Sequence, residues 1–88
     1  MFIPTTNDAE AIALAALGAT LTDDHRAERF LALTGLSPDG LRARAGERGL
    51  LAATLAFLEA HEPDLIAVAA AIGETPAALV AARGVLES

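Results

Sequence analysis

The pattern Gly-x-Ser/Thr-Pro occurs twice in this sequence, at residues 35–38 and 73–76. Glycine accepts the left-handed backbone conformation that ends many helices. The hydroxyl residue that follows can cap the next helix, and proline suits the first helical position, where no backbone N–H is needed. The two motifs predict short helices separated by sharp turns, and no stretch of the chain alternates as a strand would.

Helix caps, breaks and apolar repeats together predict six helices. Their expected ranges are 8–20, with Asn7 or Asp8 as the cap, then 23–34, 38–45, 48–61, 63–72 and 76–86. The 88 residues include 22 alanines and 14 leucines but no Trp or Tyr, which favours helix over sheet. We therefore predict an all-α fold, a compact five- or six-helix bundle in one domain over residues 1–88. Residues 1–7 are expected to form a flexible N-terminus, and residues 87–88 to be frayed.

The chain also shows a weak internal similarity. Residues 35–41 resemble residues 73–79 at an offset of 38, and residues 14–17 resemble residues 55–58 at an offset of 41. One interpretation is a bundle of two pseudo-repeated three-helix halves. The other is that caps, prolines and leucines recur because helix starts share the same chemistry. Two repeats are too few for a solenoid, so both interpretations lead to a compact bundle.

The charge balance limits the classes of partner. The chain has 12 acidic residues against 6 arginines and no lysine, a formal net charge of −6. This charge repels phosphate backbones and anionic membrane surfaces, so we expect neither as a general partner. The longest purely apolar run, residues 65–72, is far shorter than the roughly 20 residues that a membrane-spanning helix needs. No basic residue precedes the first apolar stretch, as it would in a secretory signal, so we expect a cytoplasmic protein.

Side chains that could carry catalysis or bind a metal are few. The absence of cysteine removes thiolate catalysis and cysteine-based zinc sites. His25 and His61 each lie beside acids at an expected helix end, but neither stretch has the i, i+4 spacing that places two metal ligands on one face. Ser37 has no adjacent base and is explained as a helix cap. We predict a protein that is not an enzyme and that binds neither a metal nor a cofactor.

The expected helices 8–20 and 63–72 are apolar on all sides. On the first, one face carries Leu14, Leu17 and Leu21, while the other carries Ile12, Ala15, Ala16 and Ala19. A helix that is apolar all round is either fully buried or covered by something else. We therefore predict that Ile12, Ala16 and Ala19 form a surface for a protein partner or for self-association. The alternative is that alanine serves only as a good helix former on a solvated face.

A basic island interrupts the acidic chain at Arg42, Arg44 and Arg48. Such an island can steer an acidic protein partner into register, so we predict these arginines as partner contacts. Ala69, Gly73 and Leu79 also have the small, glycine and aliphatic spacing of helix-turn-helix motifs, and Leu31, Gly35 and Leu41 match it except for the large first residue. In that alternative the three arginines would contact nucleic acid, for which they are a weak footprint in a chain of net charge −6.

A further arginine, Arg83, stands between Leu79 and Leu86 on the apolar side of the last expected helix. A long charged side chain in such a place extends its head to the surface or pairs with an acid. We expect Arg83 to do one of the two, with Glu59 or Glu62 as the partner.

The most distinctive stretch is residues 29–38, Arg-Phe-Leu-Ala-Leu-Thr-Gly-Leu-Ser-Pro, followed by Leu41 and Arg42. Together with residues 51–58, Leu-Ala-Ala-Thr-Leu-Ala-Phe-Leu, and the last proline-started helix, it resembles a family of small bacterial proteins called domain of unknown function 3572. The resemblance covers roughly residues 10–86. It implies a short, cytoplasmic, all-α protein, and no activity, cofactor or catalytic residue.

From the residues themselves we predict a non-enzymatic protein–protein interaction or adaptor module. A helix-turn-helix-like nucleic-acid-binding regulator is the alternative.

Overall fold

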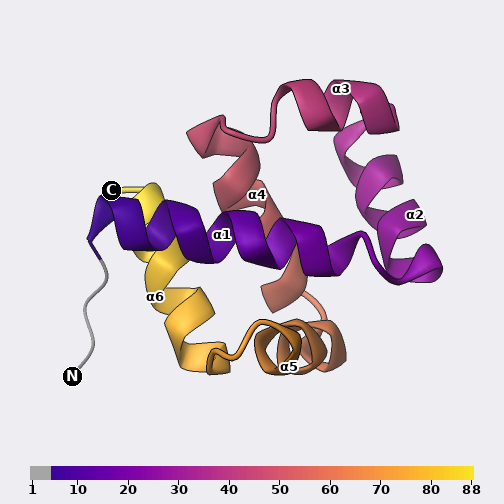
Figure 1. Ribbon diagram of the computed structural model, residues 1–88. Coiled ribbons are helices and arrows are strands. Elements are labelled where there is room, and N and C mark those ends of the chain that lie inside the picture. The colour runs from indigo at the N-terminus through magenta and orange to yellow at the C-terminus, as the bar shows by residue number, and fades with distance from the viewer. Residues whose placement is uncertain (1–4) are drawn as a thin grey trace.

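Six α-helices and no strand make up residues 5–88, the part of the chain that the computed structural model describes (Figure 1). The helices are α1 (Thr6–Thr20), α2 (Asp24–Thr34), α3 (Pro38–Ala43), α4 (Arg48–Glu59), α5 (Glu62–Ala71) and α6 (Pro76–Leu86). The predicted all-α bundle is confirmed in its six-helix form. Most helix starts match the predicted ones closely, because a side-chain cap or a proline marks each of them except the start of α4.

The start of α1 differs from the prediction, because Thr5 rather than Asn7 or Asp8 is its cap. The Thr5 hydroxyl accepts a hydrogen bond from the Asp8 backbone N–H at 3.1 Å, and the Asp8 carboxylate accepts one from the Thr5 backbone N–H at 3.3 Å. This capping box satisfies two backbone donors at once. Of the predicted flexible segment 1–7, residues 1–4 lie outside the described residues, and Thr6 and Asn7 are helical.

The two predicted glycine turns are confirmed and are nearly identical. Gly35 ends α2 with a φ of 71°, and Gly73 follows α5 with a φ of 72°. The Ser37 hydroxyl accepts from the Gly40 N–H at 3.0 Å, and the Thr75 hydroxyl accepts from the Ala78 N–H at 3.1 Å. The left-handed glycine, the hydroxyl cap and the proline therefore act in both turns as the sequence predicts.

The main core lies where α1, α4, α5 and α6 meet, and α6 packs closely on both α1 and α4. Figure 1 shows α1 lying across α4 and α6, with α2 and α3 on the side away from α6. α1 contributes the buried alanines Ala9, Ala13 and Ala16, whereas α4 contributes the larger Leu55 and Leu58. Small residues on one helix let the large residues of the next approach closely, which explains this division.

A smaller apolar cluster holds α2 and α3 to the bundle. Its buried members are Leu17, Phe30 and Leu41, with the rings of Phe30 and Phe57 packed edge to face at 5.1 Å between centroids. Phe57 belongs to α4, so this cluster connects α2 and α3 to the centre of the bundle. α3 is only 6 residues long and buries one side chain, Leu41. It therefore covers far less of its neighbours than the 11-residue α6 does.

No single helix within residues 5–88 has both the length and the hydropathy needed to cross a membrane. α5 and α6 meet both conditions only when they are taken together. The chain bends by 98° between these two helices.

Candidate interaction groove

The structure places the α1 residues that were predicted to meet a partner inside the molecule. Ile12 and Ala16 are buried in the main core, and Ala19 is partly buried against it. The predicted surface on this side of α1 is therefore corrected, because these residues pack against α4, α5 and α6. The physical reason is the size of Leu55 and Leu58 on α4, which a small-residue face accommodates better than a leucine face does.

The side of α1 that carries Leu14 and Leu21 is instead the exposed one. Leu17 is buried, but Leu14 is 51% exposed and Leu21 is 38% exposed. Ala11, Ala15 and Gly18 complete this exposed face. No charged residue occurs on it for about three helical turns, so nothing in the sequence marks this side as the solvent side.

An apolar groove of about 380 Å³ runs beside this exposed face, between α1, α2 and α3. Its walls carry a single charged side chain, that of Arg42. The lining residues are Leu14, Leu17, Gly18, Leu21, Ala27, Leu31, Pro38, Leu41, Arg42 and Ala45. Grooves with apolar walls and a charged rim are the usual receptors for amphipathic helices.

Arg42 and Arg44, the first two members of the predicted basic island, are exposed, and Arg42 lines the groove. Arg42 donates a hydrogen bond to Asp39 at 3.0 Å, and Arg44 donates one to Glu47 at 3.0 Å. The hydrogen bond to Glu47 raises the pKa of Arg44 above its usual range. Exposed ion pairs of this kind contribute little stability, so a partner carboxylate could replace either acid.

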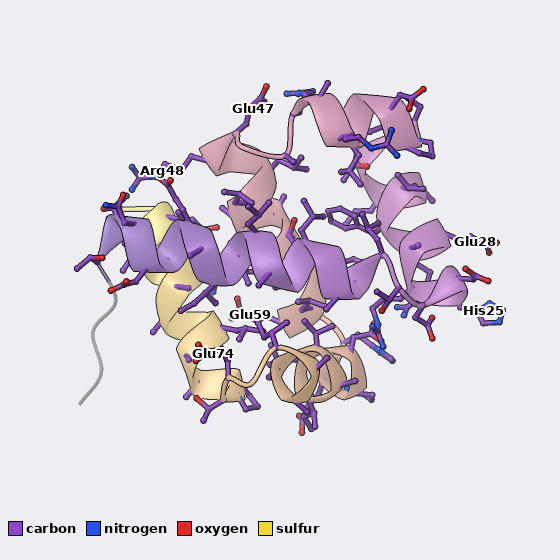
Figure 2. All side chains as sticks on the ribbon, viewed as in Figure 1. His25, Glu28, Glu47, Arg48, Glu59 and Glu74 are labelled. Atoms are coloured by element: carbon purple, nitrogen blue, oxygen red, sulfur yellow. The ribbon has the colours of Figure 1, made fainter. Side chains whose placement is uncertain are left out.

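Arg48, the third member of the predicted island, has a different role. Its guanidinium donates to the backbone carbonyls of Leu86 at 2.7 Å and Val85 at 2.9 Å, at the C-terminal end of α6. Figure 2 labels Arg48 at the start of α4, which lies beside that end of α6. A cation there satisfies helix-terminal carbonyls and opposes the helix dipole. Arg48 therefore holds the start of α4 to the end of α6, whereas Arg42 lines the groove.

A buried carboxylate that the sequence analysis did not single out ties α2 to α5. Asp64 accepts hydrogen bonds from Arg29 Nη2 at 2.7 Å and from Arg26 Nε at 3.3 Å, and His61 Nδ1 lies 3.0 Å from it. Burial alone would raise the pKa of Asp64, but the hydrogen bonds from Arg29, His61 and Arg26 outweigh this effect and lower the pKa. The arginines are one helical turn apart on α2, which was the only local indication of a shared partner.

Arg83 pairs with Glu59, as one of the predicted alternatives states. The Glu59 carboxylate accepts from both Nε and Nη2 of Arg83, the latter at 3.1 Å, and Glu87 accepts from Nη1 at 2.6 Å. These acids raise the pKa of Arg83, with the hydrogen bond to Glu59 as the largest cause. The pair connects the end of α4 to α6 and so holds the last helix on the bundle.

A second, more open hollow lies between α2 and α4. It is lined by Arg29, Leu33, Ala53, Ala56, Phe57, Ala60 and His61. Leu33 is the most exposed large apolar side chain of the described residues, at 67%, and it does not line the groove between α1, α2 and α3. This separation makes Leu33 a useful comparison residue for experiments on the groove.

Among residues 5–88, no group of three or more His, Asp or Glu side chains is placed to hold a metal ion. The Ser37 hydroxyl is used as a helix cap. The features that stand out are therefore the exposed face of α1 and the groove beside it.

The fold and the groove define a small all-α protein with an open apolar surface at one side of its bundle. A family model described as "Protein of unknown function (DUF3572)" matches residues 6–88. The chain therefore belongs to this family, in agreement with the resemblance found in the sequence. No curated protein and no solved structure matches the chain.

Proposed function

We propose that this protein is a non-enzymatic interaction module that binds an apolar helical segment of a protein in the groove between α1, α2 and α3. One observation carries the proposal: Leu14 and Leu21 remain 51% and 38% exposed on an uncharged helix face that borders an apolar groove. Burying the exposed half of a leucine side chain stabilises a complex by about 1 kcal/mol. Two such residues beside a preformed groove therefore favour a bound partner.

The rim of the groove adds a preference for acidic partners. Arg42 is the charged lining residue, and its ion pair with Asp39 is exposed on both sides. Such a pair exchanges readily for a partner carboxylate, so Arg42 can orient a bound segment at small cost. The nucleic-acid alternative has less support, because Arg42 and Arg44 each face a carboxylate in a chain of net charge −6.

The direct test is affinity purification of the tagged chain from its native host, with quantitative mass spectrometry. The groove variant is Leu14→Glu, and the matched control is Leu33→Glu. Leu33 is more exposed than Leu14 and lies outside the groove. We expect one protein near stoichiometry with the wild type and with Leu33→Glu, and its loss with Leu14→Glu. Thermal melts followed by circular dichroism check that both variants are folded. Equal recovery with both variants, or equal loss, contradicts the proposal.

A further inference from the structure

The exposed face of α1 carries an alternating series of small and large residues. Ala11, Leu14, Gly18 and Leu21 follow one another at spacings of 3, 4 and 3. This is the a/d spacing that keeps one seam of a helix facing a partner helix. We refer to these four residues as the α1 seam, and three of them also line the groove.

We propose that the occupant of this surface is a second copy of the chain, with the two α1 helices packed antiparallel about a two-fold axis. This inference rests on the proposed function and names its partner. In the pair, Leu14 of each copy lies opposite Gly18 of the other, and Leu21 lies opposite Ala11. The midpoint between positions 14 and 18 is position 16, and so is the midpoint between positions 11 and 21. One two-fold axis that passes beside residue 16 therefore produces both pairs of contacts.

The space needed for this packing is present at Gly18. A Cβ atom added to Gly18 would meet no other atom within 4 Å, so the surface above it is open. Leu14 of the second copy can fill that space, as a knob fits between small residues on a facing helix. Small residues at a helix contact also let the two axes approach to about 8 Å. A parallel pair would instead place leucine against leucine and glycine against glycine.

Charge also favours this face for contact between two copies. Each copy has a net charge of −6, so association through most of the surface brings acids together. The α1 seam itself has no charged residue. The net charges of the two copies still repel each other at longer range. Added salt should therefore strengthen the dimer by screening this repulsion.

The first test is sedimentation equilibrium of the full chain from about 10 μM to about 1 mM, in low salt and in roughly 0.15 M salt. We expect a reversible monomer–dimer equilibrium that tightens with salt. Leu14→Glu should raise the dissociation constant at least tenfold, roughly the effect of 1.4 kcal/mol. Leu33→Glu, which changes the charge equally but lies outside the seam, should not raise it comparably. A monomer throughout this range overturns the proposal.

The register is tested by Gly18→Leu, which has room to fold because the space above Gly18 is open. This variant adds apolar surface, so non-specific association would become stronger. The antiparallel seam predicts the reverse, at least a tenfold weaker dimer, because the new side chain occupies the place of Leu14 from the second copy. An unchanged or stronger dimer overturns the proposed packing.

The dimer and the proposed function fail in different ways. If the chain is monomeric but captures another protein that Leu14→Glu releases, the interaction module stands and the second copy is excluded as its partner. If Leu14→Glu changes neither the oligomeric state nor the captured proteins, both proposals are wrong.

Discussion

The half of the molecule formed by α1, α2 and α3 and the half formed by α4, α5 and α6 contain almost the same turn but pack differently. Gly35 and Gly73 have nearly equal positive φ angles, and Ser37 and Thr75 cap the helices that follow. After the first turn the chain makes the 6-residue α3, and after the second it makes the 11-residue α6. The difference lies in how much apolar surface the last helix of each half brings to the core.

The difference in packing is visible at the positions of residues 14–17 and 55–58, which match at an offset of 41. Leu17 and Leu58 are both buried, but Leu55 is 0% exposed whereas its counterpart Leu14 is 51% exposed. α6 and the alanine face of α1 cover the second half, and nothing in residues 5–88 covers the corresponding part of the first. Similar local structure therefore leads to a closed half and an open half in the same molecule. The proposed binding surface belongs to the open half.

The largest expected effects come from Leu79 and Leu41, the buried leucines that follow the two turns. Leu79→Ala should lower the free energy of unfolding by about 3–5 kcal/mol, because Leu79 lies in the main core. Leu41→Ala should cost about 2–3 kcal/mol, since the smaller cluster can collapse around the cavity more easily. Urea unfolding of both variants measures the difference. Equal losses would mean that the two halves are packed alike.

Asp64 joins the two halves, since it lies on α5 and accepts from Arg26 and Arg29 of α2. Asp64→Asn keeps the size of the side chain but removes its charge, so stability at pH 7 should fall by about 1–3 kcal/mol. Asp39→Asn, which alters an exposed ion pair, should leave stability nearly unchanged. Urea unfolding would show whether the buried and the exposed carboxylates differ in this way, and an equal effect would contradict the structure.

Stability should also depend on pH through Asp64, because its pKa is lower in the folded than in the unfolded chain. Its contribution is complete above the unfolded value of about 3.9 and is lost as the pH falls through the lower folded value. Between about pH 5 and pH 2, the wild type should therefore lose more stability than Asp64→Asn does. If the free energies of unfolding of the two proteins fell in parallel with pH, the lowered pKa of Asp64 would be contradicted.

Replacing the turn glycine by alanine should lower the free energy of unfolding equally in the two turns, whereas replacing the leucine that follows each turn should not. Gly35→Ala and Gly73→Ala each place a Cβ atom in a left-handed conformation, so each should cost about 1–2 kcal/mol. Neither added atom meets a neighbour within 4 Å, so backbone strain is the common cause. Thermal melts can compare the pair, and a loss in only one of them would show that the turns are not equivalent.

The smallest expected effect is a gain. Gly18→Ala in the open half and Gly84→Ala in α6 replace helical glycines whose added Cβ atoms meet open space. Each should raise the stability of the monomer by about 0.5–1 kcal/mol, because alanine restricts the unfolded chain more than glycine does. Chemical denaturation at low protein concentration measures this gain. A loss of stability in either variant would contradict the open space around its glycine.

The sequence predicts the helices and turns well because their causes are local. A glycine, a hydroxyl cap and a proline within four residues determine each turn without reference to the rest of the chain. The exposed side of α1 could not be predicted in the same way. Residues 11–20 contain no charge to mark the solvent side. Which side of α1 is buried therefore depends on its neighbour α4, whose large leucines pack against the small residues of α1.

The interactions of the charged residues were predictable only in part. Arg83 stands among leucines, so the sequence indicates that it needs an acid, and Glu59 provides one. Arg48 and Asp64 find partners 35 to 38 residues away in the chain, across contacts that only the packing of the helices creates. The predicted basic island therefore divides into two arginines that pair with nearby acids and one that caps α6.

The most direct test of the central claim is a dilution series of the 15N-labelled chain followed by NMR. If the α1 seam is the contact surface, amide shifts should change with concentration at Ala11, Leu14, Ala15, Gly18 and Leu21, and at neighbouring groove residues. Ile66 and Val80, which are also exposed but lie on α5 and α6, should keep their shifts. Changes centred on Ile66 or Val80, or no change up to about 1 mM, would contradict the account.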